Sequence, residues 1–218
     1  MRRLAAVLVS LGCVWAAIGC QKAGLVRDPP APYFGPRVAG GTLVAAWPAP
    51  RARMPVRPRD RQVAWDTSLW RPNGPERSWR FIVVHHSATP AGSADEFDRM
   101  HRAKGWDELG YHFVIGNGTG SANGEVEIGG RWTKQKHGAH AKIPGHPEFN
   151  DVGIGICLVG NFDVTEPTEA QMESLARLTR YLMDRYGVSQ SHIYGHGQLK
   201  PTDCPGRNFN YADLFRRL

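Results

Sequence analysis

The sequence predicts an α/β fold, a single domain with a central mixed β-sheet flanked by helices. Short, nearly all-apolar runs at residues 81–84 and 152–159 are typical of strands buried in the middle of a sheet. Capping-box patterns begin at Ser93 and at Thr168, and the stretch after each has helical apolar spacing. Strands and helices do not alternate strictly, which favours a mixed sheet. The 218 residues allow one domain of ordinary size plus extensions.

The expected strands are short and rich in apolar and β-branched residues. They lie at residues 80–85, 111–115, 125–128, 152–159 and 193–194. The connection over residues 116–124 is rich in Gly and Asn, which indicates a turn-rich link between the second and third strands.

Three helices are expected, and each has an end signal in the sequence. The first begins after Ser93 and ends at Gly105. The longest begins after Thr168 and ends at Gly187, a residue that suits the left-handed position after a helix. The last is capped by Asn210 and runs to the end of the chain.

Residues 1–20 have the pattern of a secretory signal, with a charged start, a short apolar stretch and Cys20 at the end. The apolar stretch is shorter than the roughly 20 residues that a membrane-spanning helix needs. Its last four residues, Ala-Ile-Gly-Cys, resemble a bacterial lipobox, in which Cys20 is acylated. We therefore expect export to the cell envelope, with lipid anchoring through Cys20 favoured over plain secretion. Ala17 stands where Leu is usual, which keeps secretion open.

Residues 21–78 are dense in Pro, Arg, Ala and Gly, which predicts an extended, partly disordered tether. The compact domain is expected over residues 79–218. Whether Trp65, Leu69 and Trp70 dock on that domain is left open by the sequence.

The formal net charge is +7, and the arginines crowd toward the N-terminal part. This basic segment suits either an anionic envelope surface or a solvated spacer, and the spacer is favoured. No recognised nucleic-acid-binding motif accompanies the charge, so we expect no nucleic-acid partner.

The four cysteines do not suggest a disulfide framework. Cys13 would leave with the signal and Cys20 would carry the lipid. Cys157 lies inside an apolar run and is expected to be a small buried core residue. Cys204 alone remains beside polar residues.

A metal-binding pattern connects two distant parts of the sequence. The first strand ends in His85, His86 follows it directly, and far downstream His196 and Cys204 lie eight residues apart. Neighbouring strand side chains point to opposite faces, so the two adjacent histidines cannot both reach one metal comfortably. Two imidazoles and one thiolate make three ligands, the number that a catalytic zinc uses, whereas a structural zinc takes four. The sequence therefore favours a zinc hydrolase over a zinc-stapled binding module.

Five motifs follow one another in order through the expected domain. They are Val84-His-His-Ser-Ala-Thr89, Gly105-Trp-Asp-Glu-Leu-Gly-Tyr-His-Phe113, Gly138-Ala-His140, Gly153-Ile-Gly-Ile156 and Gly195-His196 through Cys204-Pro-Gly206. Together they resemble zinc N-acetylmuramoyl-L-alanine amidases, the superfamily of phage lysozyme-type amidases and peptidoglycan recognition proteins. The resemblance implies a peptidoglycan recognition protein-like fold. It covers essentially the whole domain.

The resemblance implies a Zn²⁺ held by His85, His196 and Cys204, with His86 facing away as an interior histidine. Tyr111 matches the catalytic tyrosine of the family, whose phenol would stabilise a developing oxyanion. Thr202 is the second expected catalytic residue: it stands where some relatives carry lysine and where catalytic recognition proteins carry threonine, and its hydroxyl could position the metal-bound water or the amide.

The resemblance also implies three substrate-binding residues. His140 matches a residue that lines the cleft, Trp106 matches part of a dipeptide that marks recognition of meso-diaminopimelate stems, and Arg131 falls where an arginine binds a carboxylate.

The implied activity is zinc-dependent hydrolysis of the amide between the lactyl group of N-acetylmuramic acid and L-alanine of the stem peptide. Peptidoglycan or muropeptides are the expected partners, and the protein is expected to be a monomer. One alternative is a non-catalytic peptidoglycan-binding protein, although relatives of that kind lack the cysteine present here as Cys204. A serine hydrolase using Ser87 beside His86 is disfavoured because no Gly-x-Ser-x-Gly motif is present.

Overall fold

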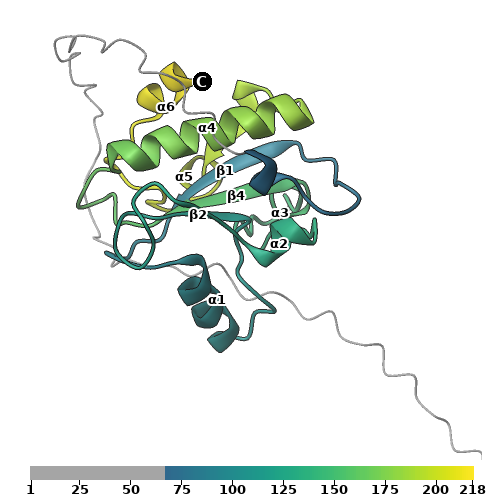
Figure 1. Ribbon diagram of the computed structural model, residues 1–218, viewed down its shortest axis with the longest axis horizontal. Helices are drawn as coiled ribbons and strands as arrows, with labels where there is room; N and C mark the ends of the chain where they lie inside the picture. The colour runs from purple at the N-terminus through teal and green to yellow at the C-terminus, as the bar shows by residue number, and fades with distance from the viewer. Residues whose placement is uncertain (1–66) are drawn as a thin grey trace, which may run out of the picture.

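The computed structural model describes residues 67–218, and the expectations for the signal, the lipobox, Trp65 and most of the tether lie outside this range. One five-stranded sheet forms the centre of the domain (Figure 1). Its strands, in spatial order, are β3 (Val126–Ile128), β2 (Phe113–Ile115), β4 (Gly153–Leu158), β1 (Phe81–His86) and β5 (Ile193–Gly195). All neighbouring strands are parallel except β2 and β3, which form an antiparallel hairpin. The predicted mixed sheet is confirmed.

The two faces of the sheet pack against different helices. Ile82 and Val84 of β1 lie in the main core together with Leu175 and Leu178 of α4 (Glu169–Tyr186). Helix α6 (Tyr211–Arg217) packs beside α4 on this face (Figure 1). A smaller core on the opposite face joins Cys157 of β4 to residues of α1 (Ala94–Ala103). His85 is aligned with Cys157 in the sheet, so its side chain points to this second face.

The predicted helix ends are found in the structure. Ser93 Oγ accepts a hydrogen bond from the Glu96 amide at the start of α1. Thr168 and Gln171 form the reciprocal capping box that opens α4. Gly187 ends α4 with a φ of 67°, in the left-handed region that favours glycine. No helix within residues 67–218 has the length and apolar character needed to cross a bilayer.

The second strand is shorter than predicted, because β2 begins at Phe113 and not at residue 111. Next to its start, the His112 side chain takes the place of a strand partner: His112 Nδ1 accepts a hydrogen bond from the Gly155 amide at 2.9 Å. Tyr111 lies just before the paired residues of β2.

The structure also contains short elements that the sequence analysis did not predict. They are η1 (Thr67–Trp70), α2 (Gly130–Thr133), α3 (Glu148–Asp151), η2 (Gln190–His192) and α5 (His196–Leu199). Each has four residues or fewer, which is too short for apolar periodicity to reveal.

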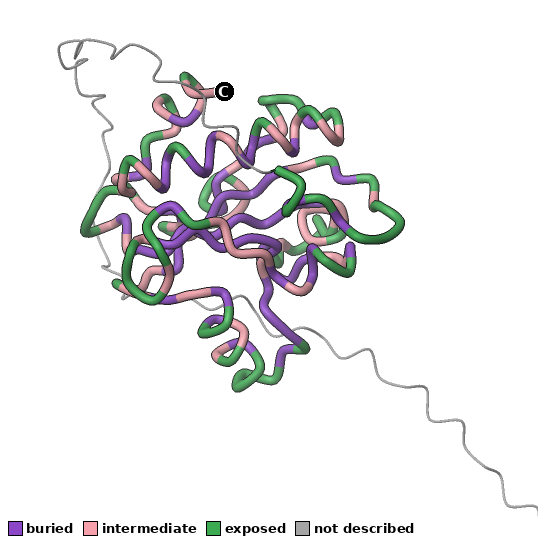
Figure 2. Tube along the Cα trace, viewed as in Figure 1, coloured by how far each residue is buried: buried purple, intermediate pink, exposed green. Residues whose placement is uncertain are grey.

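The packed core begins earlier than the boundary expected at residue 79. Trp70 is only 6% exposed and belongs to the main core, and its carbonyl accepts a hydrogen bond from Trp132 Nε1 at 2.8 Å. Glu76 forms an ion pair with Arg185 and accepts a hydrogen bond from the Tyr186 hydroxyl. The last residues assigned to the tether therefore contact the domain through Trp70 and Glu76, although most positions of residues 67–78 are exposed (Figure 2).

Replacement of Trp70 by alanine tests this docking. We expect Trp70→Ala to lower the free energy of unfolding by about 3 kcal/mol, because a large buried side chain is lost and a cavity remains. Urea unfolding would measure the change. Leu69→Ala is the matched control, since Leu69 is 70% exposed and its truncation should stay within about 0.5 kcal/mol of wild type. Equal stabilities of the two variants would contradict the docking.

Candidate metal centre

The three predicted metal ligands come together in the structure. One ligand atom from each of His85, His196 and Cys204 lies within 4.8 Å of the other two. The parallel pairing of β1 with β5 brings the two histidines together. It sets Val84 beside Gly195, so the residues that follow them, His85 and His196, lie at the same edge of the sheet. His85 Nδ1 lies 3.6 Å from Cys204 Sγ.

Backbone hydrogen bonds hold Cys204 in this place. The Gly197 amide donates to the Cys204 carbonyl at 2.6 Å, which ties the cysteine loop to α5. The His86 amide donates to Cys204 Sγ at 3.4 Å, and Thr202 Oγ1 accepts a hydrogen bond from the Cys204 amide at 3.4 Å. Thr202 thus supports the loop that carries the thiol. Burial raises the pKa of Cys204 to about 12, although the His86 amide favours the thiolate.

Both imidazoles of the cluster are neutral near pH 7. Burial lowers the pKa of His85 well below its usual range, and the neighbouring His196 lowers it further. Burial also lowers the pKa of His196 to about 3, with a contribution from Lys200. Neutral imidazoles keep a lone pair for a metal.

The donor set fits a zinc-type ion. His196 Nε2 is buried and has no hydrogen-bond partner among the described residues. A buried polar atom of this kind is rare, because its desolvation is normally offset by a hydrogen bond. Two neutral imidazoles and one thiol form a ligand set that zinc accepts.

The side chains of the two residues after His85, His86 and Ser87, form hydrogen bonds inside the domain with groups outside the ligand cluster. His86 faces the other side of the sheet, as predicted, and its Nδ1 accepts a hydrogen bond from the Phe162 amide at 3.1 Å. Ser87 Oγ shares a 2.7 Å hydrogen bond with Thr89 Oγ1 and accepts one from the Gly160 amide. Within residues 67–218 no hydrogen bond joins Ser87 Oγ to an imidazole, so the serine-hydrolase alternative gains no support.

Tyr111 lies beside the cluster. Its ring centre is 5.1 Å from that of His85, and the residue is half-buried. Burial raises the pKa of Tyr111 well above its usual range, and Cys157 raises it further. The phenol therefore stays protonated and can donate a hydrogen bond. A small pocket opens next to Tyr111, lined by Ser87, Thr89, Phe97, Met100, His101 and Tyr111.

Trp106 lies inside the domain and not on an open surface. It is 6% exposed and stacks on His101, with ring centres 4.4 Å apart. Since His101 lines the pocket beside Tyr111, Trp106 supports one wall of that pocket from behind. Direct contact of Trp106 with a stem peptide is not favoured by this placement.

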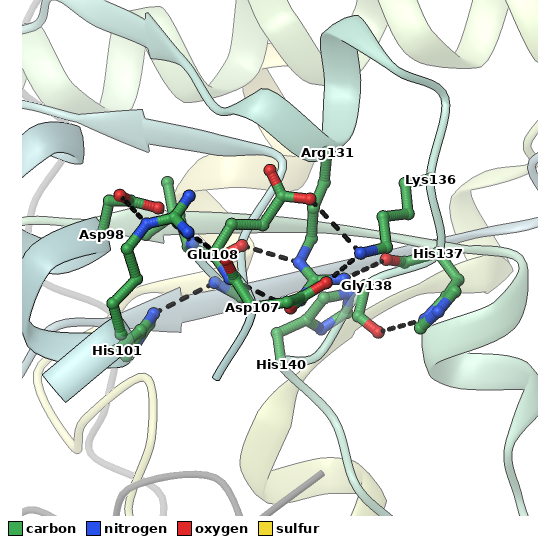
Figure 3. Close-up of polar contacts among 12 residues, drawn as sticks. Asp98, His101, Asp107, Glu108, Arg131, Lys136, His137, Gly138 and His140 are labelled. Carbon is green, nitrogen blue, oxygen red and sulfur yellow. Dashed lines mark hydrogen bonds and ion pairs between the residues drawn. The ribbon is translucent and has the colours of Figure 1, made fainter. Parts of the chain in front are cut away.

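The placement of Arg131 does not support the expectation that this arginine binds a substrate carboxylate. Its side chain is fully buried: Nε donates to the Leu109 carbonyl at 2.7 Å, Nη1 donates to the His137 carbonyl at 2.8 Å, and Nη2 forms an ion pair with Asp107 (Figure 3). No guanidinium surface remains for a substrate carboxylate. The arginine instead ties the chain leading into Tyr111 to the segment that leads into His140.

His140 also turns inward. It is 2% exposed, and its Nδ1 lies 3.1 Å from Nε2 of the ligand residue His85. The structure thus shows a contact of His140 with a candidate metal ligand, and the expectation that His140 lines a substrate cleft stays a prediction. His112 is a buried histidine of the same surroundings that the sequence analysis missed, with its ring centre 5.7 Å from that of His140. In the sequence, only its position directly after Tyr111 could have indicated that His112 lies near the site.

The comparisons with known proteins agree with this geometry. Residues 75–207 match the family model described as N-acetylmuramoyl-L-alanine amidase. The chain belongs to this amidase family. The matched range contains His85, His196 and Cys204 as well as Tyr111.

Individual relatives give the same result. A Sus scrofa protein named N-acetylmuramoyl-L-alanine amidase is 32% identical over 139 residues, which are 58% of this chain and 21% of that protein. The endolysin of Enterobacteria phage T3 is 33% identical over 139 residues, covering 60% of this chain and 83% of the endolysin. The chain thus spans about a fifth of the length of the mammalian relative.

A solved structure has a similar fold. N-acetylmuramoyl-L-alanine amidase LysC from Clostridium intestinale URNW superimposes with a TM-score of 0.55 at 31% sequence identity. The alignment covers 64% of this chain and 85% of LysC.

The internal role of Arg131 leads to a stability prediction. We expect Arg131→Met to lower the free energy of unfolding by about 3 kcal/mol, because the buried Leu109 carbonyl and the partly buried His137 carbonyl lose a donor. Asp107 also loses one ion pair, although its pair with Lys136 remains. Chemical denaturation would measure the change. Arg102→Met is the control, since Arg102 forms an exposed pair with Asp98 and its loss should matter much less. A stable Arg131→Met variant with weaker substrate binding would restore the original expectation.

Proposed function

We propose that this protein is a zinc-dependent N-acetylmuramoyl-L-alanine amidase. It would cleave the amide bond between the lactyl group of N-acetylmuramic acid and L-alanine of a peptidoglycan stem peptide. The observation that carries the proposal is the convergence of His85, His196 and Cys204 beside Tyr111 within the region that matches the family. A protein that only binds peptidoglycan needs no such cluster, and no described residue favours that alternative.

His85, His196 and Cys204 would hold the zinc. A zinc ion with three protein ligands lowers the pKa of a coordinated water to about 7 and polarises a carbonyl group. The low pKa values of the two histidines keep both imidazoles available as ligands without loss of a proton. Only the Cys204 thiol must release its proton on binding, and the His86 amide stabilises the resulting thiolate.

Tyr111 would act on the scissile carbonyl. The raised pKa keeps its phenol protonated, so it can donate a hydrogen bond to the oxygen as negative charge develops there. The adjoining pocket has apolar walls from Phe97 and Met100 and hydroxyls from Ser87 and Thr89, which suits a small group with mixed polarity next to the reacting amide.

The contact of Thr202 suggests a supporting role in catalysis. Its oxygen accepts a hydrogen bond from the Cys204 amide, so its own proton is free to donate to the substrate amide or to solvent. Threonine brings no positive charge, which distinguishes this site from relatives with lysine at the position.

The proposal extends to the setting of the enzyme. We propose peptidoglycan or muropeptides as substrates and the cell envelope as the location, with lipid attachment at Cys20 or secretion. A monomer is proposed because the ligand cluster and Tyr111 come from a single chain.

Removal of the thiol tests the metal dependence. Cys204→Ser should lose both bound zinc, measured by elemental analysis, and release of stem peptide from purified muropeptides, measured by mass spectrometry. A chelator should abolish wild-type cleavage, and added zinc should restore it. Cys157→Ala should keep its zinc, since Cys157 lies outside the ligand cluster. A zinc-free Cys204→Ser protein with full activity would refute the proposal.

Removal of the phenol tests the role of Tyr111. We expect Tyr111→Phe to retain zinc while kcat falls about 10²- to 10³-fold, the usual effect of losing one oxyanion donor. Steady-state cleavage of a soluble muropeptide would measure kcat, and elemental analysis would measure the zinc. An unchanged kcat would exclude Tyr111 from the reaction.

A further inference from the structure

His140 has two polar contacts on its ring, one with a metal ligand and one with the backbone. Its Nδ1 lies 3.1 Å from His85 Nε2, and its Nε2 lies 3.2 Å from the Gly153 carbonyl oxygen. The backbone around it is held by Asn150, whose side-chain oxygen accepts hydrogen bonds from the amides of His140 and Ala141, each at 2.9 Å. The imidazole therefore has a defined position and defined partners.

Two glycines make room for the His140 ring. A Cβ atom at Gly138 or at Gly155 would overlap this imidazole. Gly155 lies in the middle of β4, where glycine weakens a strand because it has no side chain to pack. The close approach of a buried polar ring accounts for glycine at this position, and Figure 3 shows His140 directly beside Gly138.

The Gly153 carbonyl determines which nitrogens carry protons. A carbonyl oxygen can only accept, so His140 Nε2 must be the protonated nitrogen that donates to it. In a neutral imidazole the other nitrogen then carries a lone pair, so His140 Nδ1 accepts from His85 Nε2. His85 consequently bears its proton on Nε2 and its lone pair on Nδ1, the nitrogen that lies 3.6 Å from Cys204 Sγ.

We infer that His140 is a positioning residue that fixes the tautomer and ring orientation of His85, so that Nδ1 of His85 faces the metal site. This inference rests on the proposed function, because it assigns a task toward the metal that the function requires. Hydrogen bonds of this kind to a metal-binding histidine orient the ring and increase its basicity.

The surroundings of His140 agree with a neutral acceptor. Burial lowers the pKa of His140 to about 4, the Gly153 carbonyl acts in the opposite direction, and Arg131 lowers it further. The centre of the His140 ring lies 5.1 Å from that of His85 and 5.7 Å from that of His112. Burial lowers the pKa of both neighbouring histidines well below the usual range.

The tautomer of His85 can be measured directly in the metal-free protein. ¹⁵N NMR of the histidine side chains in the whole chain should show the His85 proton on Nε2 in wild type. In His140→Phe the acceptor is absent, and the His85 signals should change to a mixture of tautomers. In His140→Asn the side-chain oxygen replaces Nδ1 as acceptor, and the wild-type tautomer should return. A His85 proton on Nδ1 in wild type would overturn the inference, whether or not His140→Phe folds.

Zinc affinity provides the second readout, measured by competition with a chromophoric chelator. We expect His140→Phe to bind zinc about 10- to 100-fold more weakly than wild type. His140→Asn should bind close to wild type. His137→Phe is the matched control on the same segment, because the His137 ring bonds to the Gly138 carbonyl and no hydrogen bond within residues 67–218 joins it to a ligand residue, so its affinity should not change.

The two hypotheses fail in different ways. A wild-type protein that binds zinc and cleaves muropeptides, together with wild-type zinc affinity in His140→Phe, would refute the role of His140 and leave the amidase proposal intact. A wild-type protein that cleaves no muropeptide would refute the amidase proposal, while the metal-free tautomer still decides the role of His140.

Discussion

The parallel pairing of β1 with β4 on one side and β5 on the other is the constraint on which the site depends. It places the ends of three strands at one edge of the sheet, so His85 at the end of β1 meets His196 directly after β5. A shift of one residue in the β1 register would turn His85 to the opposite face and bring His86 to the site. The large core between the sheet and α4 resists such a shift, because it buries Ile82 and Val84 of β1.

The site is built from polar groups in a buried setting, and this determines their chemistry. Burial keeps the imidazoles neutral and the phenol of Tyr111 protonated. Each buried group then needs a partner, since an unpaired polar atom is costly away from water. Arg131 and His140 serve as such partners, which explains why residues that the family resemblance assigns to the substrate turn inward in this chain.

Local signals predicted much of the fold. The helices begin at Ser93, Thr168 and Asn210 because short-range hydrogen bonds between a side chain and a nearby amide suffice to start them. The start of β2 was predicted two residues too early, because the His112 side chain, and not a strand carbonyl, receives the Gly155 amide. Pairings of this kind join residues far apart in sequence, and apolar periodicity contains no information about them.

By itself, the sequence determined the mixed α/β class, the helix ends and the set of three metal-ligand candidates, because these depend on residue type and on spacing over a few positions. Only the tertiary structure decided what Arg131, Trp106 and His140 contact. Their side chains are long or aromatic and suit a substrate as well as a core. The choice follows from burial and from which carbonyls and imidazoles the folded chain brings within hydrogen-bond distance.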